Sequence, residues 1–429
     1  MGFVHLHAHS SLGSRLDGVS SSEDYVKKAV SYNHKALAIT DHGRLNGIYE
    51  HQTQCLKYDI KPIIGMEMYL SDNLEMFEKK RGKGKRIRTK NYHIILLVKN
   101  EIGYKNLLYL NYLSMKDTTH FYYLPRITQK ELFANSEGLI IGTACIVNPF
   151  CSLLRAGKQD EAISLFQKYV EVFKEDFYVE LQLNELINEM DDLQYGQKTS
   201  NDFMIMMANK FGIPIVLTGD IHYTEKGQDK LQTLSIAIRN KNTIDNITFE
   251  LESKELYYHN VNDYIEFNER WKYGYSKKNI LEWCRNTEIV ADKCNFLIPL
   301  RKRLHLPQMT DDDDKNLIVE GRKGLMLRLG IDNYSEIPEE YKKRLEHELK
   351  ILIRKGFSSY CLICKDISDF SLENGIYGRI GRGSASGSIL LWALNIHNFD
   401  SIKHGLLFER FMSKDRSPDL VVDYLAKDI

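Results

Sequence analysis

The chain has 429 residues, of which 43% are hydrophobic and 27% charged; this length predicts two or three domains, because one ordinary core does not grow so large. Lys plus Arg and Asp plus Glu both number 58, and this zero balance excludes a whole-chain attraction to nucleic acid or anionic membranes, leaving only a local patch. Seven cysteines, no signal peptide and no long apolar run predict a cytoplasmic protein without a membrane partner.

The first 225 residues alternate short apolar runs with amphipathic stretches. Seven runs predict strands, at residues 3–7, 36–40, 62–70, 93–98, 138–143, 177–181 and 214–218. Helix patterns lie between several of them, including 23–32, behind the capping-box spacing of Ser20 and Glu23, and 159–174. This alternation predicts an α/β fold with a parallel sheet, either open or closed into a barrel.

The second half differs in predicted secondary structure, with helix patterns and few strands. Its predicted helices are 232–239, 277–295, 316–329, 338–355 and 360–374, and a Gly/Ser-rich segment follows Gly375. We therefore predict two domains, at residues 1–265 and 266–429.

Side chains that commonly bind metals follow the predicted strands. His7 and His9 are two residues apart and point to one face of a strand, and Asp220 and His222 repeat this spacing. Other such residues at strand ends are His42, Glu67 and Cys145. In barrels of alternating strands and helices, chemistry gathers at the carboxyl ends of the strands. Imidazole, carboxylate and one thiolate together favour zinc, manganese or iron.

Five segments of the first half resemble the polymerase and histidinol phosphatase (PHP) domain, in the version at the front of bacterial DNA polymerase III alpha subunits. They are FVHLHAHS (3–10), LDG (16–18), AITDHG (38–43), PIIGME (62–67) and TGDIH (218–222). The resemblance implies a distorted seven-stranded barrel that holds three divalent metal ions with nine ligands. The matching positions are His7, His9, Asp17, His42, Glu67, His93, Cys145, Asp220 and His222.

An intact ligand set implies, by the same resemblance, a metal-dependent 3′–5′ exonuclease acting on DNA primer–template ends. Glu67 is the expected bridge between two metals, and Asp41 is expected to assist proton transfer. A water activated by the metals would be the nucleophile. His93 begins its predicted strand instead of ending it, and nothing in the local sequence explains this position.

Four later segments resemble the entry to the family C polymerase palm: RLEHEL (344–349), GFSSY (356–360), GRGSASGS (381–388) and LFERF (407–411). A Gly/Ser-rich loop lets backbone N–H groups approach a triphosphate closely, and arginines neutralise it. The expected phosphate-binding residues are Gly381, Arg382, Gly383, Ser384, Ser386 and Arg410.

The catalytic strand of that family departs from its pattern here. Val421 stands where the first metal-binding aspartate is expected, and Asp423 alone remains of the pair. The sequence ends before the third aspartate, so magnesium-dependent polymerisation is expected only if a second polypeptide completes the site. One alternative is therefore half of a split polymerase. The others are a histidinol-phosphate-type phosphatase, against which the palm-like half argues, and a structural remnant, against which the retained ligands argue.

Overall fold

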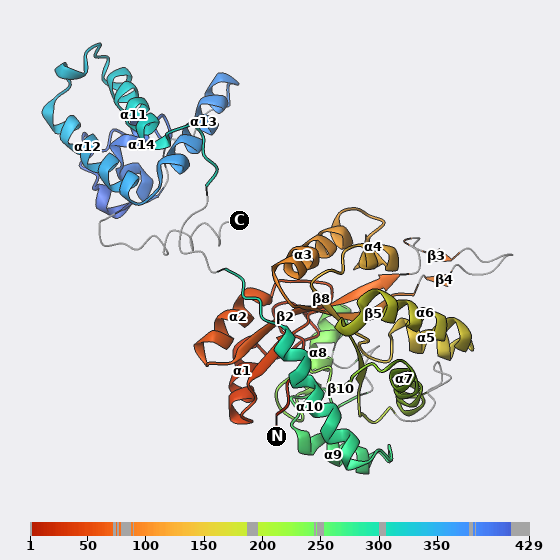
Figure 1. Ribbon diagram of the computed structural model, residues 1–429. Coiled ribbons are helices and arrows are strands. Elements are labelled where there is room, and N and C mark those ends of the chain that lie inside the picture. Colours follow the sequence, from red (N-terminus) through yellow and green to blue (C-terminus); the bar gives the residue numbers. More distant parts are fainter. Residues whose placement is uncertain are drawn as a thin grey trace. The chain divides into compact units, whose positions relative to one another are not determined.

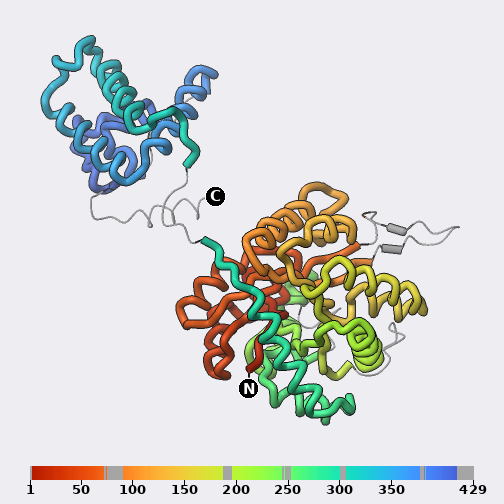
Figure 2. Tube along the Cα trace, in the orientation of Figure 1, coloured from red at the N-terminus to blue at the C-terminus, as the bar shows by residue number. Residues whose placement is uncertain are grey.

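The computed structural model describes residues 2–71, 74, 77–78, 87–88, 90–186, 196–243, 246, 253–299, 306–376, 381 and 383–412. The chain forms two compact units, Met1–Ile298 and Pro299–Ile429 (Figures 1 and 2). Within the described residues, no helix is long and apolar enough to cross a membrane.

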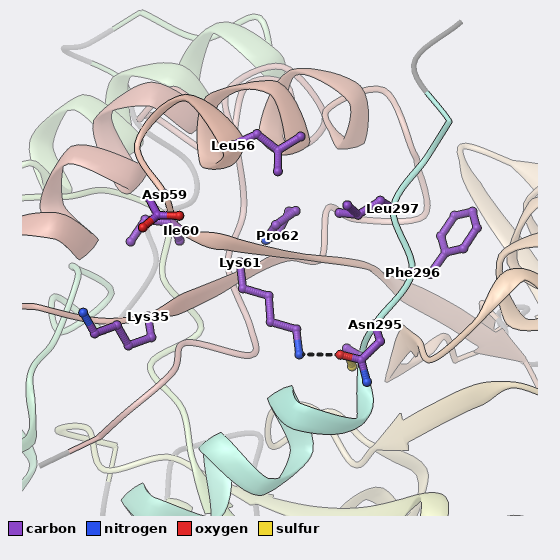
Figure 3. Close-up of a pocket in the computed structure, with 10 residues that line it drawn as sticks. Lys35, Leu56, Asp59, Ile60, Lys61, Pro62, Asn295, Phe296 and Leu297 are labelled. Atoms are coloured by element: carbon purple, nitrogen blue, oxygen red, sulfur yellow. Dashed lines mark hydrogen bonds between the residues drawn. The ribbon is translucent and has the colours of Figure 1, made fainter.

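The boundary between the units lies later than the predicted 265/266, because helix α10 (Lys277–Lys293) packs against strand β10 (Ile215–Leu217). The chain that leaves α10 is also fastened to the first unit. Lys61 Nζ donates a hydrogen bond to Asn295 Oδ1 at 2.9 Å (Figure 3). The Gln52 side chain exchanges two hydrogen bonds with the backbone of Ile298. The first unit therefore extends to Ile298.

The first unit is built around a curled sheet. Its strands are β1 (Ala36–Ile39), β2 (Lys61–Ser71), β5 (Tyr92–Val98), β6 (Phe121–Tyr122), β7 (Leu124–Thr128), β8 (Leu139–Gly142), β9 (Phe177–Leu181) and β10. The hydrogen-bonded order is β10-β9-β8-β5-β2-β7-β6, with β1 also paired to β2. A separate ribbon pairs β3 (Phe77–Glu78) with β4 (Ile87–Arg88).

The first predicted strand connects the two sides of this sheet. His5 bridges to Leu37 in β1, and Ala8 bridges to Ile221 just after β10, both in parallel. Together with β1, β2, β5, β8, β9 and β10, this segment makes up the seven strands of the barrel wall. The predicted distorted seven-stranded barrel is thus confirmed.

Strand β5 runs against its neighbours, whereas β1–β2, β8–β9 and β9–β10 are parallel. It pairs antiparallel with β2 on one side and with β8 on the other. The beginning of β5 consequently lies at the edge where the parallel strands end. This direction explains His93: it starts its strand and still reaches the edge that carries the other candidate ligands.

Both faces of the barrel wall are buried, which is why its strands read as continuous apolar runs. Ile63, Ile95 and Val216 belong to an inner cluster. Alternate residues, such as Ile64 and Leu96, pack outward against the surrounding helices. Since side chains alternate along a strand, Glu67, His93 and Glu180 point into the barrel, on the same side of the wall as this inner cluster.

Ten helices surround the described barrel. They are α1 (Ser22–Ser31), α2 (Ile48–Lys57), α3 (Glu101–Met115), α4 (Gln129–Ala134), α5 (Pro149–Arg155), α6 (Gln159–Phe173), α7 (Gln197–Phe211), α8 (Asp229–Arg239), α9 (Val261–Arg270) and α10. Capping boxes begin three of them, at Ser21, Thr128 and Asn260. Each satisfies backbone N–H groups that a helix start leaves without partners.

The second unit is helical where it is described. It contains α11 (Asp313–Leu329), α12 (Glu339–Arg354), α13 (Ser358–Glu373) and the short α14 (Ile389–Ala393). Short 3-10 turns lie at Tyr334–Glu336, Ser384–Gly387 and Phe408–Arg410. Leu317, Leu345, Leu349 and Leu390 are part of its separate apolar core.

Candidate metal centre

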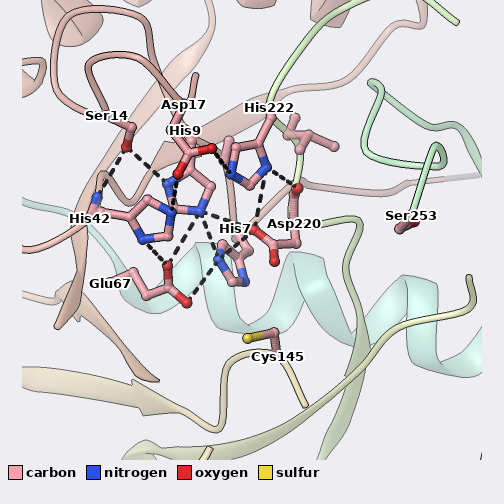
Figure 4. Close-up of polar contacts among 12 residues, drawn as sticks. His7, His9, Ser14, Asp17, His42, Glu67, Cys145, Asp220, His222 and Ser253 are labelled. Atoms are coloured by element: carbon pink, nitrogen blue, oxygen red, sulfur yellow. Dashed lines mark hydrogen bonds and ion pairs between the residues drawn. The ribbon is translucent and has the colours of Figure 1, made fainter. Parts of the chain in front are cut away.

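Loops and strand ends at one edge of the barrel bring the predicted metal ligands together, and Figure 4 shows eight of the nine. Several residues of these loops have left-handed backbone: Leu16 (φ 62°), Ala144 (φ 60°) and Asp220 (φ 47°). Leu16 and Ala144 directly precede Asp17 and Cys145. For residues with a side chain this conformation is costly, and such strain persists where the surrounding structure imposes it, often at functional sites.

Glu67 lies at the centre of the cluster and is fully buried. Its Oε2 is 2.6 Å from His42 Nδ1, and its Oε1 is 2.8 Å from His93 Nδ1. His7 Nε2 and His9 Nε2 are 3.6 and 3.5 Å from the two oxygens. Burial alone would raise the pKa of Glu67, but the neighbouring imidazoles of His93, His42 and His7 hold it well below its usual range.

The proton on His7 is placed by a buried carboxylate. His7 Nδ1 donates to Glu180 Oε1 at 2.6 Å. Its Nε2 is the nitrogen that faces the cluster, 3.1 Å from Asp220 Oδ1 and 3.0 Å from His9 Nε2.

The proton on His9 is placed by a hydroxyl. Ser14 Oγ donates its only proton to Asp41 Oδ1 at 2.9 Å, so it accepts from His9 Nδ1 at 3.1 Å. His9 Nε2 is therefore also the nitrogen that faces the cluster, and it lies 3.0 Å from Asp220 Oδ1. Two imidazole nitrogens and a carboxylate oxygen converge on one point, an arrangement that can hold a cation.

Two further features favour bound cations. His222 Nδ1 donates to the Asp220 carbonyl at 2.8 Å, which frees its Nε2 to bind a metal. His42 Nδ1 and Glu67 Oε2 lack hydrogen-bond geometry despite their proximity, so both are buried without a hydrogen-bond partner. Three ligand groups in the described residues are compact enough to hold an ion: His9–His42–His222, His7–His9–Asp220 and His42–Glu67–His93. The donor set fits divalent metals that prefer nitrogen and oxygen.

Asp17 and Cys145 lie at the margins of this cluster. Asp17 Oδ2 is 3.4 Å from His42 Nε2, and its Oδ1 is 3.8 Å from His222 Nε2. Cys145 Sγ is 3.6 Å from His93 Nδ1. Burial, with Glu67 and Asp220 nearby, raises the pKa of Cys145, so its thiol needs an adjacent cation to become a thiolate ligand. The structure thus brings all nine predicted ligands to one edge.

Sequence reasoning did not identify Glu180, although it lies directly behind a ligand. Besides accepting from His7, its Oε1 accepts from Thr218 Oγ1 at 2.5 Å. Carboxylates in this position fix the orientation and tautomer of metal-binding histidines. The available signal was a glutamate inside an otherwise apolar strand, β9, in which every residue is buried.

Asp41 is placed beside the cluster, where it organises a loop. Its carboxylate accepts from the Ser10 backbone N–H at 2.6 Å, from Ser10 Oγ at 2.8 Å and from Ser14 Oγ. Gly13 packs against it so closely that a β-carbon there would lie 1.9 Å from Asp41 Oδ2. Asp41 thus reaches His9 through Ser14, and its structural contribution is to set the tautomer of that ligand.

The predicted phosphate loop of the second unit is described in part. Ser384 and Gly383 are exposed, Ser386 is half-buried, and Gly381 lies against Phe399. Arg410 is exposed at the end of a 3-10 turn. Arg382 and Asp423, together with the expected catalytic strand, lie outside the described residues. The backbone amides of Ile389 and Leu390, at the end of the loop, are already bound by Glu348.

Comparisons with known proteins agree with this division of the chain. Residues 5–184 match the PHP domain family, and residues 315–427 match the bacterial DNA polymerase III alpha NTPase domain. A DNA polymerase III subunit alpha from Borreliella burgdorferi is 33% identical over 427 residues, covering 98% of this chain and 35% of that protein. The one from Aquifex aeolicus is 34% identical, covering 98% of this chain and 36% of the relative.

The chain therefore spans about a third of the length of these relatives. Among solved structures, an endonuclease Q complex with a 27-mer duplex carrying an abasic lesion aligns with 92% of this chain and 90% of its own. Its TM-score is 0.28 at 9% identity, a likeness too slight to extend to activity.

Proposed function

Since the chain belongs to the family of bacterial DNA polymerase III alpha subunits, with a PHP domain at its front, we propose that this domain hydrolyses phosphodiester bonds at DNA 3′ ends. The observation that supports the proposal is the convergence of the Nε2 atoms of His7 and His9 on Asp220 Oδ1. Such a centre suits a cation and a negatively charged substrate. No phosphate-sized anion would approach Glu67, Asp17 and Asp220 unless their charge were compensated.

Divalent metals at this centre would supply Lewis acidity, lowering the pKa of water and neutralising the phosphate. Three metal ions of zinc, manganese or iron are proposed, held by the nine residues named above, with Glu67 as the proposed bridge between two of them. Glu180 and Ser14 contact Nδ1 of His7 and His9, so Nε2 of each ring is the atom that would face a metal at the centre. The apolar cluster that includes Ile63, Ile95 and Val216 lies on the inward face of the barrel wall, like the ligands Glu67 and His93.

The role of the second unit stays a proposal of nucleotide binding by its Gly/Ser-rich loop. Gly381, Gly383, Ser384, Ser386 and Arg410 would contact phosphates together with Arg382. Magnesium-dependent synthesis would additionally require Asp423 and carboxylates from a further polypeptide.

The test is a nuclease assay on a 3′-labelled DNA primer–template. Metal-stripped protein receives manganese, zinc or magnesium, beside His7→Ala/His9→Ala and the control His347→Ala, which changes a half-exposed histidine of the second unit. We expect metal-dependent shortening from the 3′ end that the double variant loses and the control keeps. Fully metallated protein that leaves the DNA intact would contradict the proposal.

A further inference from the structure

The hairpin formed by β6 and β7 borders the candidate metal centre. Strand β7 pairs with β2 through Arg126 and Tyr69. The Tyr69 ring stacks on His42 and meets His93 edge-on, with centroids 5.9 and 5.0 Å apart. Gly43, which follows His42, approaches the hairpin so closely that a β-carbon would lie 2.5 Å from Pro125 Cγ. The hairpin is therefore part of the rim of the site.

An exposed and strained aromatic residue forms the tip of this hairpin. Tyr123 has a left-handed backbone, with φ 60°, and 73% of it is exposed. Its ring meets the Tyr122 ring edge-on at 4.6 Å, and the neighbouring Phe121 is also exposed. Left-handed backbone is unfavourable for a bulky residue, and here it carries a ring that is largely exposed.

Side-chain contacts hold the base of the hairpin in place. His120 lies between two carboxylates, with Nδ1 2.9 Å from Asp117 Oδ1 and Nε2 3.0 Å from Glu131 Oε1. The buried Arg126 guanidinium donates to the Thr119 carbonyl at 2.7 Å. Preorganisation of this kind reduces the entropy that a binding surface loses when it meets its ligand.

One cationic side chain contacts a candidate ligand, and two more arginines are close to ligands in the sequence. Arg239 Nη1 lies 3.4 Å from Asp17 Oδ2 and remains partly exposed. Arg15 and Arg44 lie two residues from Asp17 and His42 along the chain. An edge that combines arginines with an exposed aromatic platform has the two elements by which proteins bind single-stranded nucleic acid.

We propose that Tyr123 stacks on a base near the 3′ end of single-stranded DNA, while the arginines bind the adjoining phosphates. This inference deepens the proposed function and rests on it, because it names the form of DNA that the site receives. A base can stack on the tyrosine only after it leaves its partner. The preferred substrates are therefore single strands and mismatched or frayed 3′ ends.

The experiment measures stacking separately from cleavage. The full chain, loaded with manganese, is titrated into a single-stranded oligonucleotide that carries 2-aminopurine near its 3′ end and phosphorothioates in its last linkages. Anisotropy reports binding, and quenching of 2-aminopurine reports stacking. Tyr123→Gly removes the ring and suits the left-handed backbone, Tyr123→Phe keeps the ring, and Phe370→Ala removes an exposed aromatic of the second unit.

We expect Tyr123→Gly to weaken binding about 10-fold, the loss of one stacked base, and to abolish quenching without lowering the melting temperature. Tyr123→Phe and Phe370→Ala should bind as the unchanged protein does. Equal binding and quenching by Tyr123→Gly would overturn the inference, even if the DNA is cleaved. Loss of quenching in that variant would support it, even if no metal restores cleavage.

Discussion

Glu67 of the first unit and Glu348 of the second are both fully buried, yet their surroundings are opposite. Both carboxylate oxygens of Glu348 have hydrogen-bond donors. They accept from Ser388 Oγ at 2.7 Å, from the Ile389 and Leu390 amides at 3.0 Å, and from Arg344 Nε at 2.7 Å. Glu67 faces imidazoles, and its Oε2 has no hydrogen-bond partner. Burial of a carboxylate does not by itself indicate a site; an incomplete set of partners does.

The largest effect in this comparison is expected from Glu348→Ala. It removes the acceptor that caps α14 and leaves Arg344 without its carboxylate. Breaking such a buried pair costs about 3–5 kcal/mol of unfolding free energy, visible as lost hydrogen-exchange protection at Ile389 and Leu390. Glu346→Ala, which breaks the exposed pair with Arg322, should cost less than about 1 kcal/mol. If Glu348→Ala and Glu346→Ala lowered the unfolding free energy equally, the buried, fully hydrogen-bonded Glu348 would contribute no more than an exposed carboxylate.

The next effect concerns the support behind the metal ligands. Glu180→Gln replaces the charged acceptor of His7 with an amide of the same size. We expect affinity for zinc or manganese to fall about 10–100-fold, measured by calorimetry on metal-stripped protein. Glu175→Gln, an exposed change just before β9, is the matched control. An unchanged affinity in Glu180→Gln would show that His7 needs no such support.

The buried histidine His51, outside the metal centre, makes the stability of the first unit depend on pH. His51 Nε2 donates to the Leu37 carbonyl at 2.9 Å, and burial lowers the pKa of His51 from 6.5 to about 4. The unfolded chain therefore binds the proton more tightly, so stability is present above pH 6.5 and falls as the pH drops towards 4. Between pH 7.5 and 5 this residue should cost about 2 kcal/mol.

Denaturant titrations of metal-free protein at both pH values measure this loss. His51→Gln removes the titrating group, so its stability should decline less over the same interval. If the variant and the unchanged protein decline in parallel, other groups govern the acid sensitivity.

The smallest effect is expected at the left-handed Ala144. Glycine adopts this backbone without strain but costs more conformational entropy on folding. Ala144→Gly should therefore raise the unfolding free energy by at most about 1 kcal/mol. The melting temperature of metal-free protein measures it. A clear loss of stability would mean that the Ala144 side chain contributes packing that outweighs its strain.

Local sequence patterns predicted much of the barrel and its ligand edge. The helices expected at 159–174 and 277–295 are observed as α6 and α10 with nearly the same bounds. Spacing placed His7 with His9 and Asp220 with His222, because side-chain direction along a strand follows from residue number alone.

Non-local features could not be predicted in this way. The antiparallel direction of β5, and with it the position of His93, depends on how the strand is connected and paired rather than on its own residues. Glu180 becomes informative only once His7 lies beside it, 173 residues away in sequence. The sequence predicts that Asp41 assists proton transfer, but it does not show that the Asp41 carboxylate also holds the Ser10–Ser14 loop, which depends on contacts 27 and 31 residues apart.

The bridge from Ala8 to Ile221 has a consequence for how the protein is made. His9 and Asp220 meet across 211 residues, and ribosomes add about 5–20 residues per second. The segment that contains His9 is therefore synthesised roughly 10–40 s before the Asp220 segment that it pairs with. Because Asp220 completes the His7–His9–Asp220 group, that group can bind a metal only after this interval, whereas the His42–Glu67–His93 group needs no residue beyond 93.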